Sequence, residues 1–226
     1  MSIYTILERL EFLRGEPAAL LVVIAAALAI AAWDMRVVLP ALAVQYLASF
    51  LLFVDVLDPR LAIVYLFIGI IVTLIMTITA AQVNWGRAPA NLTPTEHAQS
   101  GSSFLTIGPF RLTPQQLIRL VLAIAVPIGL YLWSRTGELP ALATLPPPVQ
   151  FAVFGLVALG LVGIATGGPL FGGVGVLIFL NGFDLFNSSV EQSIALVIGL
   201  SAANLLVALT IAYLAQARAM LAGPVE

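Results

Sequence analysis

Long apolar runs, separated by short polar breaks, dominate this sequence. Seven of them are predicted as membrane-spanning helices, because a helix needs about 20 mainly apolar residues to cross the hydrocarbon core. We place the spans at residues 18–33, 36–56, 60–84, 114–134, 149–168, 171–189 and 192–216. The short break from Gly167 to Leu170 leaves a count of six as the alternative. Such continuous runs exclude a β-barrel, whose strands alternate apolar and polar side chains.

Residues at the ends of the runs favour seven helices. Asp58 and Thr113 each stand before a proline, which is a typical helix start. Tryptophans, whose rings prefer the headgroup level, fall at three predicted span ends: Trp33, Trp85 and Trp133.

The runs are grouped unevenly along the chain. Residues 2–14 place apolar side chains on one helical face and charged ones on the other, which predicts a short amphipathic helix at the interface. With three spans this helix forms a front part, residues 1–84. A polar loop, 85–113, separates it from a four-helix rear part, 114–226. We therefore expect an all-α polytopic membrane protein with a single membrane domain.

Composition supports this class. Of 226 residues, 61% are hydrophobic and 9% charged, whereas soluble domains carry about 45–50% apolar and about 25% charged residues. The chain has no Cys, and its single His, His97, lies in the polar loop. An iron–sulfur cluster, a thiolate metal site, a disulfide and a His-ligated haem array are not expected. We expect no cofactor, so any redox chemistry belongs to a partner.

The charged residues give little information about a partner or about the orientation in the membrane. Nine basic residues are scattered among the loops and the formal net charge is −2, which gives no basic patch for nucleic acid. The basic residues divide almost equally between the two sides, so the positive-inside rule gives little orientation. We expect the lipid bilayer of a bacterial plasma membrane, with loop 85–113 and the C-terminus in the cytoplasm.

Small residues recur in the rear part and predict close helix packing in lipid. They are Gly155, Gly160, Gly163, Gly167, Gly172, Gly173 and Gly175. No phosphate loop or nucleophile elbow is present, so we do not expect the chain to be an enzyme by itself.

Polar residues inside spans carry the functional information, because each needs a reason to be there. An Asp at the centre of a spanning helix costs about 2.5–3.5 kcal/mol on insertion scales. Asp184 is the first candidate, and Asn181 shares its helix face and could hydrogen-bond it. Asp184 either lies in the membrane interior in a functional role or sits at the membrane border near solvent.

A second amide and a weaker set complete the candidates. Asn204 falls near mid-membrane, either as an interhelical hydrogen-bonding group or as a relay. Gln45, Thr73 and Thr77 are weaker, since threonine hydroxyls commonly bond to their own helix. Asp184 is the only group among these that can store a proton, so the chain is too poor in buried acids to be a complete pump.

The chain resembles membrane component E of hydrogenase 4. The rear segment Leu180-Asn181-Gly182, followed by Ala202-Ala203-Asn204, resembles that family's sixth and seventh helices. The run from Arg36 through Gln45 to a Ser resembles the second helix of that family. The order of three helices, polar loop and four helices is also the same.

The last three helices are also similar to the K subunit of respiratory complex I and to the C subunit of multisubunit cation/proton antiporters. Gly182-Phe183-Asp184 stands where those subunits carry Gly-Leu-Glu, and Asn204 stands where they carry a second Glu. Component E of hydrogenase 4 carries a Glu-Asn-Gly motif in its sixth helix and an Asp in its seventh. In that alignment Leu180 stands at the position of the Glu and Asn204 at the position of the Asp. The pair of proton-channel acids is thus reduced to at most one.

This resemblance implies a non-catalytic subunit in the membrane arm of a proton- or ion-translocating complex, an oxidoreductase or an antiporter. It would link or scaffold antiporter-like subunits. The alternative is a structural or assembly subunit of another respiratory or photosynthetic complex, with its glycine faces on neighbouring helices. A small independent transporter is the third hypothesis.

Overall fold

The computed structural model describes residues 11–86, 105–107, 110–112, 114–136 and 145–221. These residues form seven α-helices, which confirms the all-α class. The helices are α2 (Glu16–Ala31), α3 (Met35–Val56), α4 (Pro59–Gln82), α6 (Pro114–Thr136), α7 (Pro147–Thr166), α8 (Pro169–Val190) and α9 (Ile194–Leu221).

The observed helices match the predicted spans closely, and the break at Gly167–Gly168 separates α7 from α8. Six helices are long and apolar enough to cross a membrane, and α2, with 16 residues, is a shorter apolar helix. The chain is therefore an integral membrane protein whose surroundings are a lipid bilayer.

Short elements join the helices. The 3₁₀ turn η1 (Glu11–Leu13) precedes α2, and a second 3₁₀ turn, η2 (Asn84–Gly86), follows α4. The predicted polar loop contains a minimal antiparallel hairpin, β1 (Leu105–Ile107) and β2 (Phe110–Leu112), which the composition does not indicate. Most of the predicted amphipathic helix at 2–14 lies outside the described residues.

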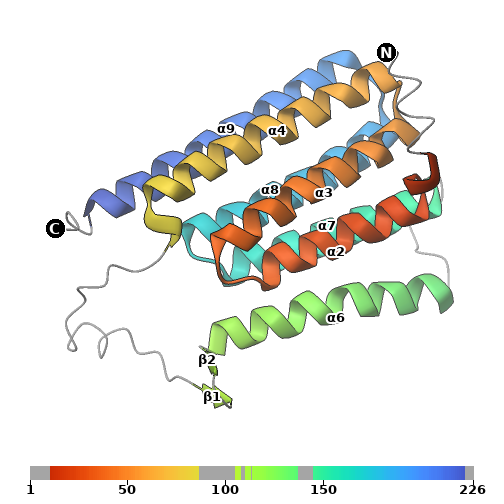
Figure 1. Ribbon diagram of the computed structural model, residues 1–226. Coiled ribbons are helices and arrows are strands. Elements are labelled where there is room, and N and C mark those ends of the chain that lie inside the picture. The colour runs from red at the N-terminus through yellow and green to blue at the C-terminus, as the bar shows by residue number, and fades with distance from the viewer. Residues whose placement is uncertain (1–10, 87–104, 108–109, 113, 137–144, 222–226) are drawn as a thin grey trace.

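The long helices form two rows of three (Figure 1). One row is α2–α3–α4, and the other is α7–α8–α9; α2 packs on α7, α3 on α8 and α4 on α9. Facing helices run in the same direction, because α6 follows α4 in the sequence and crosses the bundle once more before α7 begins. Helix α6 stands beside the α2–α7 pair and is the most exposed span. In its most apolar stretch 11% of the residues are buried, against 72% in that of α3.

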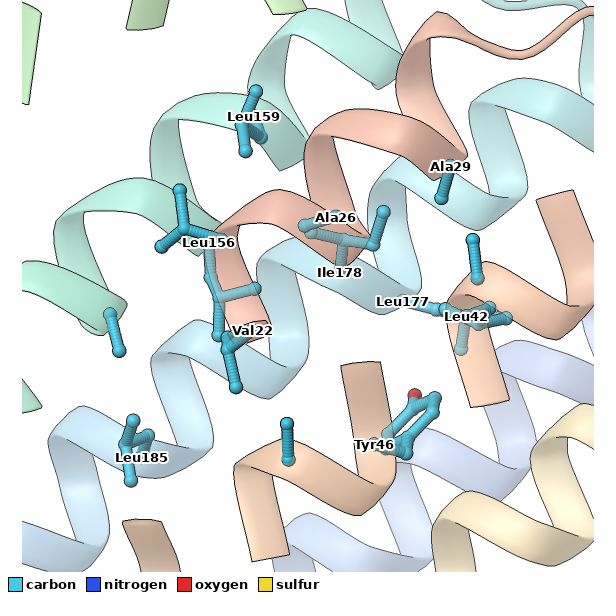
Figure 2. Close-up of a cluster of buried hydrophobic side chains, with 14 of the residues drawn as sticks. Val22, Ala26, Ala29, Leu42, Tyr46, Leu156, Leu159, Leu177, Ile178 and Leu185 are labelled. Atoms are coloured by element: carbon cyan, nitrogen blue, oxygen red, sulfur yellow. The ribbon is translucent and has the colours of Figure 1, made fainter. Parts of the chain in front are cut away.

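The hydrophobic core lies between the two rows (Figure 2). Val22 and Ala26 of α2 meet Leu156 of α7 and Ile178 of α8 there, and all four side chains are essentially inaccessible. Because α3 and α8 stand in the middle of their rows, side chains on their facing sides are enclosed by the other helices.

Glycines bring α7 and α8 into backbone contact. A Cβ atom added to Gly160 would lie 2.6 Å from the backbone N of Phe179, and one on Gly163 would lie 2.8 Å from Cα of Gly175. Contacts this short exclude any side chain. The predicted close packing is thus confirmed, and these glycines face another helix of the same chain.

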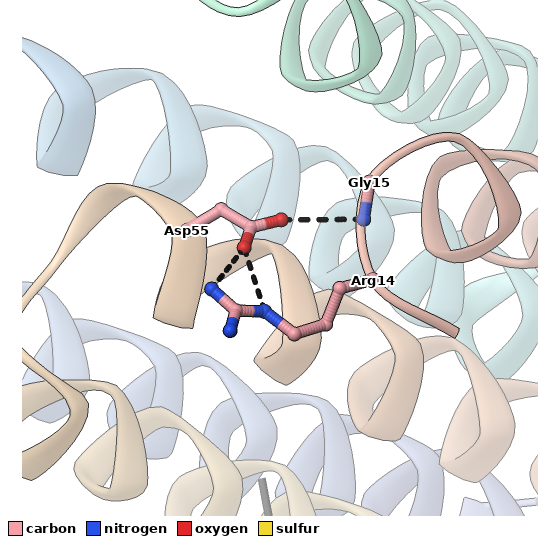
Figure 3. Close-up of polar contacts among 3 residues, drawn as sticks. All are labelled: Arg14, Gly15 and Asp55. Carbon is pink, nitrogen blue, oxygen red and sulfur yellow. Dashed lines mark hydrogen bonds and ion pairs between the residues drawn. The ribbon is translucent and has the colours of Figure 1, made fainter. Parts of the chain in front are cut away.

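The acidic residues at helix ends have local partners. Asp34 and Asp58 cap α3 and α4 by accepting hydrogen bonds from the backbone N–H groups of Arg36 and Arg60. Asp55, in the last turn of α3, forms an ion pair with Arg14 at 2.5 Å and also accepts from the Gly15 N–H (Figure 3). These contacts fasten the start of α2 to the end of α3.

We expect Gly160→Ala to lower the free energy of unfolding by about 1–3 kcal/mol, because the new methyl group must push α7 away from α8. The matched control is Gly199→Ala in α9, where an added Cβ meets nothing within 4 Å. Alanine there should be neutral or stabilising by up to about 1 kcal/mol. Unfolding of both variants in mixed micelles measures the difference, and equal losses would contradict the contact.

Candidate functional site

Asp184 lies inside the bundle, on the face of α8 that points away from lipid. Its side chain is 2% exposed, although it stands only about two turns before the end of α8. Burial therefore excludes a solvent-exposed Asp184 side chain, while the depth of Asp184 in the membrane stays a prediction. The reason is rotational: Phe183, its neighbour, faces outward and is 41% exposed.

Asn204 of α9 supplies the hydrogen bond that the carboxylate needs. Its Nδ2 donates to Oδ2 of Asp184 and also to the backbone O of Leu200, the latter at 3.2 Å. Asn204 is itself 2% exposed. The two strongest candidates from the sequence thus form one buried pair that joins α8 to α9.

Asn181 does not bond to Asp184 as the helical spacing suggested. Its Nδ2 donates instead to Oγ of Ser49 in α3, at 2.8 Å. Asn181 and Asp184 share a face of α8, but Ser49 lies opposite Asn181 in the facing row and accepts the hydrogen bond from its amide. Gln45, about one turn before Ser49 on α3, is fully buried too.

A third bond connects α8 to α4. The hydroxyl groups of Ser188 and Tyr65 lie 3.1 Å apart, and the Tyr65 ring stacks on Phe53 with centroids 4.0 Å apart.

We call these groups the buried polar cluster. It comprises Gln45, Ser49, Tyr65, Asn181, Asp184, Ser188, Ser201 and Asn204. The cluster draws on α3, α4, α8 and α9, and three hydrogen bonds between helices tie those four together.

The cluster occupies only one half of the bundle. Its members extend from the end where α8 finishes and α9 begins to about the middle of α3. Toward the α7–α8 turn the described interior is mostly apolar, with Leu42, Leu177 and Ala208 fully buried, although Arg119 of α6 is also buried at that end. Thr79 is buried in that half, but its hydroxyl donates to Ile75 O of its own helix. The buried polar groups of the cluster thus gather in the half of the bundle where α8 ends and α9 begins.

Several cluster atoms keep free hydrogen-bonding capacity. The cluster atoms that are buried and without a partner in the described residues are Oδ1 of Asp184, Oδ1 of Asn204, Oγ of Ser201 and both amide atoms of Gln45. An unsatisfied buried polar group costs about 1–3 kcal/mol. Groups of this kind favour water or a small cation between them.

The weaker threonine candidates lie elsewhere. Thr73 and Thr77 donate to carbonyl groups one turn back in α4, both at 2.7 Å. They line an apolar groove of about 400 Å³ between α3 and α4, on the outside of the bundle. The structure therefore separates them from the cluster.

Sequence reasoning missed Ser49, Tyr65, Ser188 and Ser201 as site residues. A helical signal was available for three of them: Ser49 stands four after Gln45, Ser188 four after Asp184 and Ser201 three before Asn204. Tyr65 gave no such signal, because its partner lies on another helix.

The described residues offer no group of three or more His, Cys, Asp or Glu side chains that could hold a metal ion. Asp184 is the sole acid of the cluster. Its chemistry is therefore that of one protonatable carboxyl surrounded by amides and hydroxyls.

Comparison with family models, with curated proteins and with solved structures finds no match for this chain. The resemblance to hydrogenase 4 component E stays a prediction from the sequence.

We expect Asn204→Ala to lower the free energy of unfolding by about 1–2 kcal/mol, since it leaves the buried carboxylate without its donor. Asn187→Ala is the control, because Asn187 only donates to Phe183 O of its own helix. It should cost less than about 0.5 kcal/mol.

A double-mutant cycle with Asp184→Asn isolates the pair. If Asn204→Ala is equally costly in the wild-type and Asp184→Asn backgrounds, the two side chains are not coupled and the hydrogen bond contributes nothing.

Proposed function

We propose that this chain is a non-catalytic membrane-arm subunit of a proton- or ion-translocating energy-converting complex, related to hydrogenase 4, complex I or the multisubunit antiporters. The observation that carries the proposal is the half-bundle distribution of the buried polar cluster around Asp184. A group that stores a proton, with amides and hydroxyls on both sides, is the chemistry of a proton relay.

The mostly apolar character of the other half supports a role with partner subunits. A path that ends at the middle of the bundle cannot carry an ion across the membrane alone. Antiporter-like subunits, packed against the exposed helix faces, would supply the remainder. An independent transporter, by contrast, needs polar groups on both sides of a midplane site.

The structural-subunit alternative, in which glycine faces bind neighbouring helices, is favoured less. Gly160, Gly163 and Gly175 pack α7 against α8 within this chain, so these three glycines do not point to another subunit. A purely structural role also gives no reason to bury a carboxylate with an unsatisfied Oδ1.

The orientation and location belong to the same proposal. With the C-terminus and loop 85–113 in the cytoplasm of a bacterial cell, the polar cluster lies nearer the outer face of the plasma membrane. Asp184 would then exchange protons with that side.

Replacement of Asp184 by Asn tests the relay, because the amide keeps the shape but cannot carry a proton. We expect proton translocation by the assembled complex, measured in inverted vesicles, to fall about tenfold or more, while Asp184→Glu retains much of it. Asp55→Asn, which changes an acid at the helix end, is the control and should leave the rate unchanged.

Unchanged pumping with Asp184→Asn would remove Asp184 from the mechanism. Purification in mild detergent, with identification of the co-eluting chains, tests the subunit assignment separately. A chain that elutes alone and transports ions in vesicles would overturn it.

A further inference from the structure

Arg119 is a buried cation outside the polar cluster. It stands near the start of α6, and its side chain is 6% exposed. Its guanidinium lies over the ring of Phe171, in the first turn of α8, with 5.0 Å between Cζ and the ring centroid.

The guanidinium has no hydrogen-bond acceptor for two of its nitrogens. Nε and Nη2 are buried and without a partner in the described part of the chain. The Phe171 ring attracts the positive charge but accepts no strong hydrogen bond. Asp34, the described acid at this end of the bundle, accepts from the backbone N–H of Arg36 at the start of α3 and does not bond to these two nitrogens of Arg119.

An arginine in this state calls for an anion. Arginine stays charged in proteins, and a buried charge without a partner is costly. The planar fork of its N–H groups fits two oxygens of a phosphate or carboxylate.

The position of Arg119 indicates where the anion comes from. Arg119 lies about 8 Å along α6 from Pro114, at the end of the bundle where Trp33 and Trp85 mark the headgroup level. Beside it on α6, Ile118, Val121 and Leu122 are exposed to lipid. A phosphate held here would carry its acyl chains along an apolar helix surface.

We propose that Arg119 binds the phosphate of a net-anionic phospholipid headgroup, seated between the start of α6 and the α7–α8 turn. A zwitterionic headgroup brings its own cation, which offsets the phosphate charge, so the net-anionic lipid is preferred. This lipid site fastens the loosely packed α6 to α8 and is independent of the relay at Asp184.

The test is binding of phosphatidylglycerol to the purified full chain, measured by native mass spectrometry and by the shift of the melting temperature. Phosphatidylglycerol should bind about tenfold more tightly than phosphatidylcholine, and Arg119→Gln should remove this preference. Arg218→Gln is the matched control, since Arg218 is an exposed arginine in the last turn of α9.

Arg119→Lys serves if the glutamine variant does not fold. Lysine keeps the charge but not the fork, so the preference for phosphatidylglycerol should persist with weaker binding. Retention of the full preference in Arg119→Gln would overturn the proposal. So would an equal melting shift from inorganic phosphate alone, which would assign the site to free phosphate.

Discussion

Helices in lipid gain little from hiding apolar surface, so their association depends on close contact and on hydrogen bonds between them. In this protein the decisive contact is the approach of α7 to α8 at Gly160, Gly163 and Gly175. It fixes the rotation of α8 about its axis. With one side of α8 held against α7, the side that carries Asn181 and Asp184 must face α3 and α9.

The polar contacts follow from that rotation. Asn181 reaches across to Ser49 in the other row, Asp184 meets Asn204, and Ser188 meets Tyr65. The same helix therefore uses glycine to pack on one side and polar side chains on the other. Packing and chemistry are separated by face, so a change on one face reaches the other through the placement of α8.

Much of the fold is predictable from the sequence, because apolar length alone defines a span. Asp58 before Pro59 marks the start of α4, and Gly167–Gly168 marks a real break. Burial of Asp184 is not predictable in this way, since it depends on which neighbours surround α8. The partners Ser49 and Tyr65 come from distant parts of the chain, and no local spacing announces them. Loop composition likewise gave no sign of the hairpin from Leu105 to Leu112.

The shortness of α2 has a consequence for the surrounding bilayer. Its 16 residues reach about 24 Å, less than the roughly 30 Å of a typical hydrocarbon core. A segment shorter than the core is accommodated by local thinning of the bilayer, by flanking side chains such as Arg14 that reach toward water, or by association with other helices. Since α6 beside it has 23 residues and reaches about 34 Å, any such adjustment is confined to the surroundings of α2.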